Sequence, residues 1–302
     1  MRHLTVFGNA FALLTAAAVL GALQAGCAVK TADGDSDVLG TQDSALVEDD
    51  GEASEVETDA EAGMEDPLSG AEAADPLGTA GSAETDAELR DRMAKNPGRF
   101  FTPAGCIVTT VDPSANSATS VFTNCVGPYN RRTYNGTVVT TWSRAAGKLT
   151  VKHDAVGFRI DAATVEHHAT ITYEKSAGTL VRTRQAQTTG TTKKGKALSR
   201  SVTMSTVFDP ASRCTTRDGS AETTVGDRTH SRTVTGLKVC GNRFACPTAG
   251  TIVLQRKNGD SVTLSFDGAA AVSVSSPRLG RPVRHALQCL AAQAPAPSTP
   301  AN

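Results

Sequence analysis

Residues 99–290 alternate between apolar and polar side chains with a period of two, and this pattern constrains the fold more than any other feature. In residues 262–267, Val, Leu and Phe alternate with Thr, Ser and Asp, and residues 164–173 repeat the pattern with Thr, Glu and His on the polar side. Successive side chains of a strand point to opposite faces, so this period describes sheets with one buried and one solvated face. We therefore predict an all-β fold for this part of the chain.

Turn signals separate the alternating runs. Asp112-Pro113, Gly226-Asp227 and residues 176–178 are rich in turn-forming residues, and Asn258-Gly259 accepts the positive φ of a type I′ hairpin. No stretch within the domain is long enough for a helical crossover between parallel strands. The sequence predicts an antiparallel meander of about a dozen strands, as a curved sheet, barrel or sandwich, and a single closed or strongly curved sheet is preferred.

Six of the seven cysteines lie in this domain. Hairpins that turn within residues 112–118 and at Asp227 place two pairs of cysteines directly opposite each other, and the last two then close a loop around the final strands. Metal binding is the alternative, but the chain lacks a Cys-x-x-Cys pair, and an exported protein favours disulfides. The predicted disulfides are Cys106–Cys125, Cys214–Cys240 and Cys246–Cys289.

The first residues form an export signal. A weakly positive start precedes the apolar residues 4–23, and small residues lead to Cys27. This order is typical of a secretory signal, and its end resembles a lipobox, so we predict a signal peptide over residues 1–26 and a lipid on Cys27. Ordinary secretory cleavage and an uncleaved anchor are the alternatives. Because Ala28 is not Asp, the sorting rule of enteric bacteria predicts anchorage in the outer membrane.

An acidic segment separates Cys27 from the domain. Residues 28–91 contain 20 Asp or Glu against two Lys or Arg, and no aromatic residue. Such a composition buries too little apolar surface to offset the entropy of the chain, so we predict a disordered linker over residues 27–84 that holds the domain off the membrane.

A short helix is predicted to close the linker. Thr85 and Glu88 have the spacing of a capping box, and Leu89 and Met93 share a face that would pack on the domain. The predicted organisation is a signal peptide at 1–26, an acidic linker at 27–84, a short helix at 85–96, a basic Cys-rich β domain at 97–290 and a Pro/Ala-rich flexible tail at 291–302.

Charge divides the chain into two parts. From Arg92 onward, 27 Lys or Arg stand against 11 Asp or Glu, a net charge of +16, whereas residues 28–91 carry −18. A basic domain attracts anionic polymers, so anionic polysaccharide, lipopolysaccharide and extracellular DNA are the predicted partners. Alternatively, the acidic segment folds back and neutralises the domain, or the charge only keeps it soluble. The predicted polyanion contacts form the densest basic cluster, which we place in a loop between strands: Lys193, Lys194, Lys196 and Arg200.

Motifs for catalysis, cofactors and metals are weak. Residues 190–196 match GxxxxGK, but Ala197 replaces the Ser or Thr that would hold magnesium, and the segment joins strands. Glu166 and His168 share a strand face and would bind a metal only if His153 came across from the neighbouring strand. We assign no catalytic, cofactor or metal residue from the sequence.

Several runs around the cysteines resemble a group of uncharacterised myxobacterial lipoproteins with a six-cysteine all-β domain. They are Asn96–Cys106, Asn124–Tyr129, Thr224–Thr229, Cys240-Gly241 and Cys246-Pro247. That group has no established activity, so the resemblance implies a lineage and a topology but no mechanism.

Three function classes follow from the sequence. The first is a cell-envelope lipoprotein whose basic β domain binds anionic envelope polymers. The second is a structural or protein-interaction lipoprotein. The third is an extracellular hydrolase, since an active site assembled from distant loops leaves no linear motif.

Overall fold

The computed structural model describes residues 28–30, 41–69, 85–95, 101–127, 132–145, 147–176, 178–241 and 245–288. The predictions for the signal peptide, the lipid on Cys27 and the tail at 291–302 lie outside these residues. So do residues 31–40 and 70–84 of the predicted linker.

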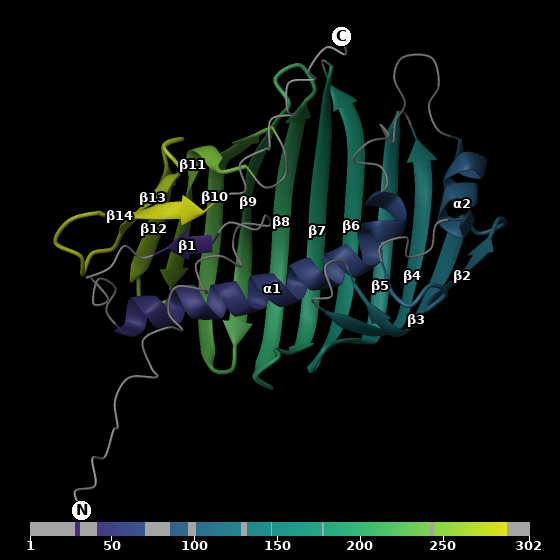
Figure 1. Cartoon of the computed structure of the whole chain (residues 1–302), viewed down its shortest axis with the longest axis horizontal. Coiled ribbons are helices and arrows are strands. Elements are labelled where there is room, and N and C mark those ends of the chain that lie inside the picture. Colours follow the sequence, from purple (N-terminus) through teal and green to yellow (C-terminus); the bar gives the residue numbers. More distant parts are fainter. Residues whose placement is uncertain are drawn as a thin grey trace, which may run out of the picture.

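The described strands form one open antiparallel sheet (Figure 1). Thirteen of them, β2 to β14, follow each other as a meander, and β1 pairs with the far side of β14. The sheet does not close on itself, because β1 and β2 lie at opposite ends of the strand order. The strands are β1 (Ala28–Lys30), β2 (Ile107–Asp112), β3 (Ser117–Val126), β4 (Thr133–Ala145), β5 (Lys148–Ile160), β6 (Ala163–Ser176), β7 (Thr179–Thr191), β8 (Ala197–Asp209), β9 (Cys214–Val225), β10 (Arg228–Cys240), β11 (Pro247–Arg256), β12 (Ser261–Phe266), β13 (Ala271–Ser275) and β14 (Val283–Gln288).

The all-β antiparallel prediction is confirmed, and the predicted turns lie between strands. Asn258-Gly259 joins β11 to β12, and Gly259 has a φ of +89°. Gly226-Asp227 joins β9 to β10. Because a positive φ costs glycine little, these turns fix the register of the strands that they join.

The two disulfides within the described residues are those predicted, Cys106–Cys125 and Cys214–Cys240. Cys214 and Cys240 face each other across β9 and β10, as expected. The predicted register of the first pair is wrong, since the backbone carbonyl of Cys106 accepts a hydrogen bond from Thr123 rather than facing Cys125. Asn124, with a φ of +48°, lies at an irregularity within β3, where the pairing with β4 shifts register between Phe122 and Cys125.

The third predicted disulfide is described at one end only. Cys246 is disulfide-bonded, and Cys289 lies outside the described residues. The pairing of Cys246 with Cys289 therefore stays a prediction.

The short helix α2 (Asp86–Lys95) confirms the prediction for residues 85–96. The capping box is formed as expected: the backbone N–H of Glu88 donates to Thr85 Oγ1 at 3.2 Å, and the backbone N–H of Thr85 donates to Glu88 Oε2 at 2.7 Å. Leu89 is fully buried in a cluster with Trp142 and Leu149. The side chain of Met93 lies outside the description.

A second helix, α1 (Thr41–Ser69), contradicts the linker prediction for these residues, and β1 contradicts it for Ala28–Lys30. It crosses one face of the sheet, which we call the inner face (Figure 1). Val56 is buried in one hydrophobic cluster with side chains of β3 to β6, and Leu46 is buried in another with β10 to β14. Among the described residues, no helix is long and apolar enough to cross a membrane.

The linker prediction fails because it treats the segment in isolation. Glu48 and Glu52, and likewise Glu57 and Glu61, are like charges four residues apart, which destabilise a free helix. On the sheet these carboxylates face Arg and Lys side chains. The helix therefore forms through contacts with distant parts of the chain, which the composition of residues 28–91 does not reveal.

Candidate anion-binding site

The inner face carries a group of buried cationic and imidazole side chains at its centre. They come from β7, β8 and β10, at positions where the strands turn every second residue toward α1. We call this group the basic inner cluster. Its members are Arg184, Arg200, His230 and Arg232, none of which is more than 8% exposed.

Asp50 and Glu57 of α1 lie within the basic inner cluster, and Glu61 also pairs with Arg184. Arg200 donates to Asp50 Oδ1 at 3.0 Å and to Glu57 Oε2 at 2.7 Å, and Arg184 donates to Glu57 Oε1 at 2.7 Å. His230 Nε2 lies 3.4 Å from Asp50 Oδ1. Removing charges from water is costly unless they are paired and hydrogen-bonded, and here each buried charge has a partner of opposite sign.

Electrostatics keep both carboxyl groups ionised. Burial alone would raise the pKa of Asp50, but the charges of Arg200 and Arg232 outweigh burial and hold that pKa well below its usual range. Burial likewise opposes ionisation of Glu57, and Arg200 with Arg184 lowers its pKa. Because the folded-state pKa values are lowered, these pairs stabilise the fold above the ordinary carboxyl range and lose that contribution as the pH falls through the lowered values.

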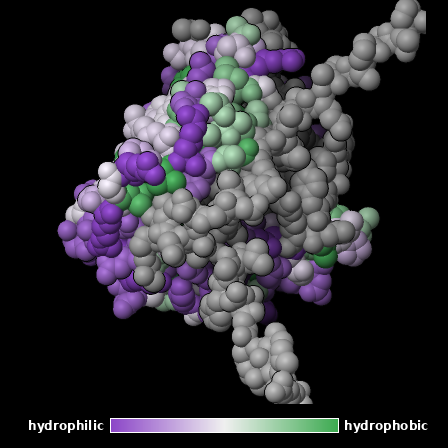
Figure 2. Space-filling view, turned by 60° about the vertical axis from the view of Figure 1, so that its left-hand side comes forward, coloured by the Kyte–Doolittle hydropathy of each residue, from purple (hydrophilic) through white to green (hydrophobic). Residues whose placement is uncertain are grey.

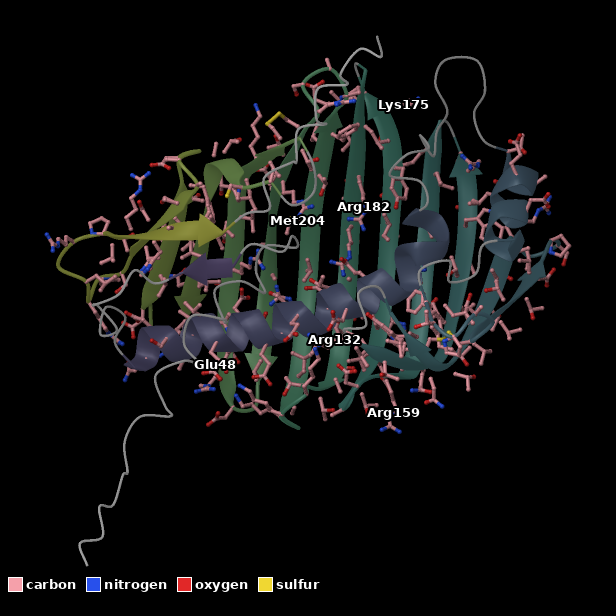
Figure 3. All side chains as sticks on the ribbon, viewed as in Figure 1. Glu48, Arg132, Arg159, Lys175, Arg182 and Met204 are labelled. Carbon is pink, nitrogen blue, oxygen red and sulfur yellow. A yellow bond between two sulfur atoms is a disulfide. The ribbon has the colours of Figure 1, made fainter. Side chains whose placement is uncertain are left out.

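More exposed cations surround the cluster, and we call them the rim cations. Lys194 Nζ lies 2.6 Å from Glu48, and Lys193 Nζ lies 3.0 Å from both Glu55 and Asp59. Figure 3 shows the labelled Glu48 and Arg132 along the course of α1 over the sheet. The rim cations are Arg132, Lys193, Lys194, Lys196 and Arg228.

Together the two sets pair with most of the acidic side chains that the structure describes on α1, and Asp43 pairs instead with Arg278. Eight carboxylates of α1 pair with eight Arg and Lys of the sheet and its loops. The carboxylates are those of Glu48, Asp49, Asp50, Glu52, Glu55, Glu57, Asp59 and Glu61. The alternative in which the acidic segment neutralises the domain therefore describes this face.

The four predicted polyanion contacts are brought together here, with one difference. Lys193, Lys194 and Lys196 lie in or beside the β7–β8 turn, and each pairs with carboxylates of α1. Arg200 lies within β8 rather than in a loop, and it is only 4% exposed. All four contact an anionic segment of the same chain, and contact with an external polymer stays a prediction.

The order of residues in α1 contains a helix signal that the composition of the segment does not reveal. Asp43, Asp50 and Glu57 recur every seven residues, and each is buried. Leu46, Ala53 and Ala60 recur with the same spacing in hydrophobic clusters. Seven residues are close to two helical turns, so acidic and apolar side chains form two adjacent stripes on one side of the helix.

The candidate metal residues are not brought together. His153 points to the inner face, is 1% exposed and hydrogen-bonds to Thr140. His168 lies on the opposite, outer face, where Nδ1 is 2.7 Å from Asp154. Within the described residues, no three His, Cys, Asp or Glu side chains gather as a metal site.

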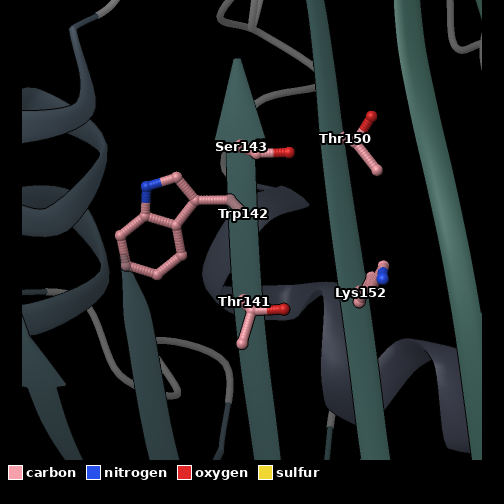
Figure 4. A pocket seen from close by; sticks show the side chains of 5 residues that line it. All are labelled: Thr141, Trp142, Ser143, Thr150 and Lys152. Carbon is pink, nitrogen blue, oxygen red and sulfur yellow. The ribbon is translucent and has the colours of Figure 1, made fainter. Parts of the chain in front are cut away.

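A small hollow lies on the outer face between β4 and β5 (Figure 4). Its volume is about 230 Å³, and it is lined by Thr, Ser and Lys152 side chains, with Trp142 at its border and the Trp142 ring on the opposite side of β4 (Figure 4). This lining holds neither a carboxylate nor an imidazole, so the hollow offers no acid–base pair for hydrolysis.

Comparisons with known proteins place this chain in no family. No family model, curated protein or solved structure matches it.

Proposed function

We propose that this protein is a lipid-anchored cell-envelope protein that binds a linear anionic polymer at its inner face, in competition with α1. One observation carries the proposal: eight cationic side chains of the inner face already pair with eight carboxylates spaced along helix α1. A surface whose cations pair with one linear polyanion offers the same cations to another. Such binding is electrostatic and weakens as the salt concentration rises. Acidic polysaccharide, lipopolysaccharide and extracellular DNA are ligands of this class.

Helix α1 is held weakly enough for an anionic polymer to displace it from the inner face. Among the side chains of residues 42–61, which the structure describes, few large apolar ones are buried, chiefly Leu46, Val47 and Val56. Each contributes about 1.5–3 kcal/mol, and the buried ion pairs offset much of their attraction through desolvation. A polymer that replaces the carboxylates keeps the buried cations paired, whereas an uncharged ligand would leave them without partners.

The proposed location in the cell envelope rests on the signal around Cys27 and on the disulfides. The lipobox-like end at Cys27 supplies an attachment point, and Ala28 favours the outer membrane. Disulfides persist in oxidising compartments, which agrees with an exported protein.

A protein-interaction role is the second candidate, and a row of exposed valines on the outer face favours it. Val108, Val121 and Val156 lie on neighbouring strands in register, with Thr137 between the last two. They are 61%, 42% and 66% exposed. Exposed apolar patches of this kind mark protein contacts on soluble surfaces.

Loosening α1 at its exposed edge is expected to tighten polymer binding. Replacing Glu48 and Glu55 with Gln removes partners of rim cations while leaving the basic inner cluster intact. We expect the Kd for dextran sulfate at low salt to fall about tenfold, because Lys193 and Lys194 each lose one of two carboxylate partners and the competing helix loses two negative charges. Fluorescence anisotropy with labelled polymer measures the Kd, and lipopolysaccharide and duplex DNA are then compared.

The control makes the same change of net charge on the outer face. Glu166 and Glu222 are exposed there, and their replacement by Gln is expected to change the Kd by about twofold or less. Equal tightening by both double variants would mean that only net charge matters. Absence of binding in every variant would exclude the proposed function.

A further inference from the structure

The β14 edge of the sheet is joined almost directly to the predicted lipid attachment point. β1 begins at Ala28, the residue after Cys27, and pairs with β14 in antiparallel register. Ala28 lies opposite Gln288, and Lys30 lies opposite Ala286. One residue spans at most about 3.5 Å, so a lipid on Cys27 leaves almost no spacer between the membrane and this edge.

The same end of the sheet carries exposed cations. Arg281 and Lys257 are exposed, and Arg284, whose side chain is 54% exposed, pairs with the equally exposed Asp267 at 2.9 Å. Arg278 is partly paired with Asp43 and Asp260 of its own chain. Figure 2 brings this end forward and shows a broad hydrophilic area beside a smaller hydrophobic one. Cations next to a lipid anchor are attracted to anionic headgroups within a Debye length of the surface.

From these two features we infer that the β12–β14 end of the sheet is a membrane-contact surface for anionic lipid headgroups. The inference rests on the lipid at Cys27 that the proposed function includes. The sheet then stands with its β14 edge on the membrane and its β2 edge away from it. Helix α1 lies across the sheet rather than between the sheet and the lipid, so residues 41–69 do not form a stalk (Figure 1).

Quenching by brominated lipids tests this orientation in the lipidated full-length protein. Gly280 is exposed in the β13–β14 loop and has open space around it, and Ser114 is exposed in the β2–β3 turn at the far end. In vesicles of phosphatidylcholine with about one third phosphatidylglycerol, we expect brominated lipid to reduce the added emission of Gly280→Trp about twofold. Ser114→Trp and the buried native Trp142 are expected to keep their emission.

Two sets of charge variants complete the test. Neutralising the cations at the β14 end is expected to abolish most of the quenching of Gly280→Trp, whereas neutralising three cations of β5 is expected to leave it. The first set is Arg278→Gln, Arg281→Gln and Arg284→Gln, and the matched set is Lys148→Gln, Lys152→Gln and Arg159→Gln. Figure 3 labels Arg159, at the lower end of the sheet in that view.

The outcomes separate this inference from the proposed function. If Cys27→Ser releases the protein from membranes while Gly280→Trp and Ser114→Trp are quenched equally, the anchor is right and the membrane-contact surface is wrong. If Cys27→Ser stays bound to vesicles of phosphatidylcholine alone, which offer the cations no anionic headgroup, the anchor itself is wrong. Equal effects of the two triple variants would also overturn the inference.

Discussion

Replacing Arg200 with methionine is expected to lower the free energy of unfolding by about 3–5 kcal/mol. Arg200 is 4% exposed and bonds to Asp50, Glu57 and Thr223 at once. Methionine keeps most of the volume but leaves two buried carboxylates with too little positive charge. Urea unfolding followed by circular dichroism measures the change, and coincident transitions by fluorescence check the two-state assumption.

The matched control is Lys194→Met at the exposed edge of the same helix. Lys194 pairs with Glu48 at 2.6 Å, but both side chains are about half exposed, so the loss should stay below about 1 kcal/mol. Should Arg200→Met be insoluble, Arg200→Lys keeps the charge and loses the forked geometry, and an intermediate loss is expected. Equal small losses for Arg200 and Lys194 would contradict a buried cationic centre.

Replacing Gly190 with alanine is expected to cost at least about 3 kcal/mol, through strain and overpacking together. Gly190 lies on β7 opposite Val165 of β6, with a φ of +140°. A Cβ there would lie 2.9 Å from the Cα of Val165 and would collide with the carbonyl oxygen of Thr164. Backbone atoms cannot swing aside as a flexible side chain does. A lower midpoint in urea unfolding is the measured result.

Gly195→Ala makes the same substitution in the adjoining β7–β8 turn. Gly195 has a φ of +76°, and nothing lies within 4 Å of a Cβ built on it. The cost is then that of the left-handed conformation alone, about 1–2 kcal/mol. If Gly190→Ala is no more destabilising than Gly195→Ala, the close approach of β6 and β7 at that point is wrong.

The sheet was predictable because its information is local. Alternation in residues 262–267 and the Asn258-Gly259 turn each involve a few neighbouring residues. Hairpin registers then bring Cys214 opposite Cys240 without any long-range contact. The first pair shows the limit of this reasoning, because the irregular φ of Asn124 shifts the register of Cys125 and alternation alone does not reveal it.

Helix α1 was not predictable from composition because its partners are distant in the sequence. Glu57 bonds to Arg184 and Arg200, which lie 127 and 143 residues away. Averaged over the segment, the acidic residues indicate repulsion and disorder. Only the seven-residue spacing of Asp43, Asp50 and Glu57 distinguishes one face of a helix from a random acidic segment.

The candidate site was located only in part for a related reason. Lys193, Lys194 and Lys196 stand out as a run, whereas the buried cations are isolated in strands. Arg232 shares a face with the buried Val234, as Arg200 does with Val202. A cation on the apolar side of an alternating strand requires a buried counter-charge, and this signal points to the inner face.

Amide hydrogen exchange of α1 in the full-length protein shows whether charge holds the acidic helix against the inner face. If the acidic segment is folded by charge against the inner face, amides of residues 43–60 are protected at low salt. Their protection then falls by at least about tenfold at 1 M salt, where the Debye length is about 3 Å. Amides of β5 to β8 stay protected at both salt concentrations. Exchange of residues 43–60 at unprotected rates under both conditions would contradict the account.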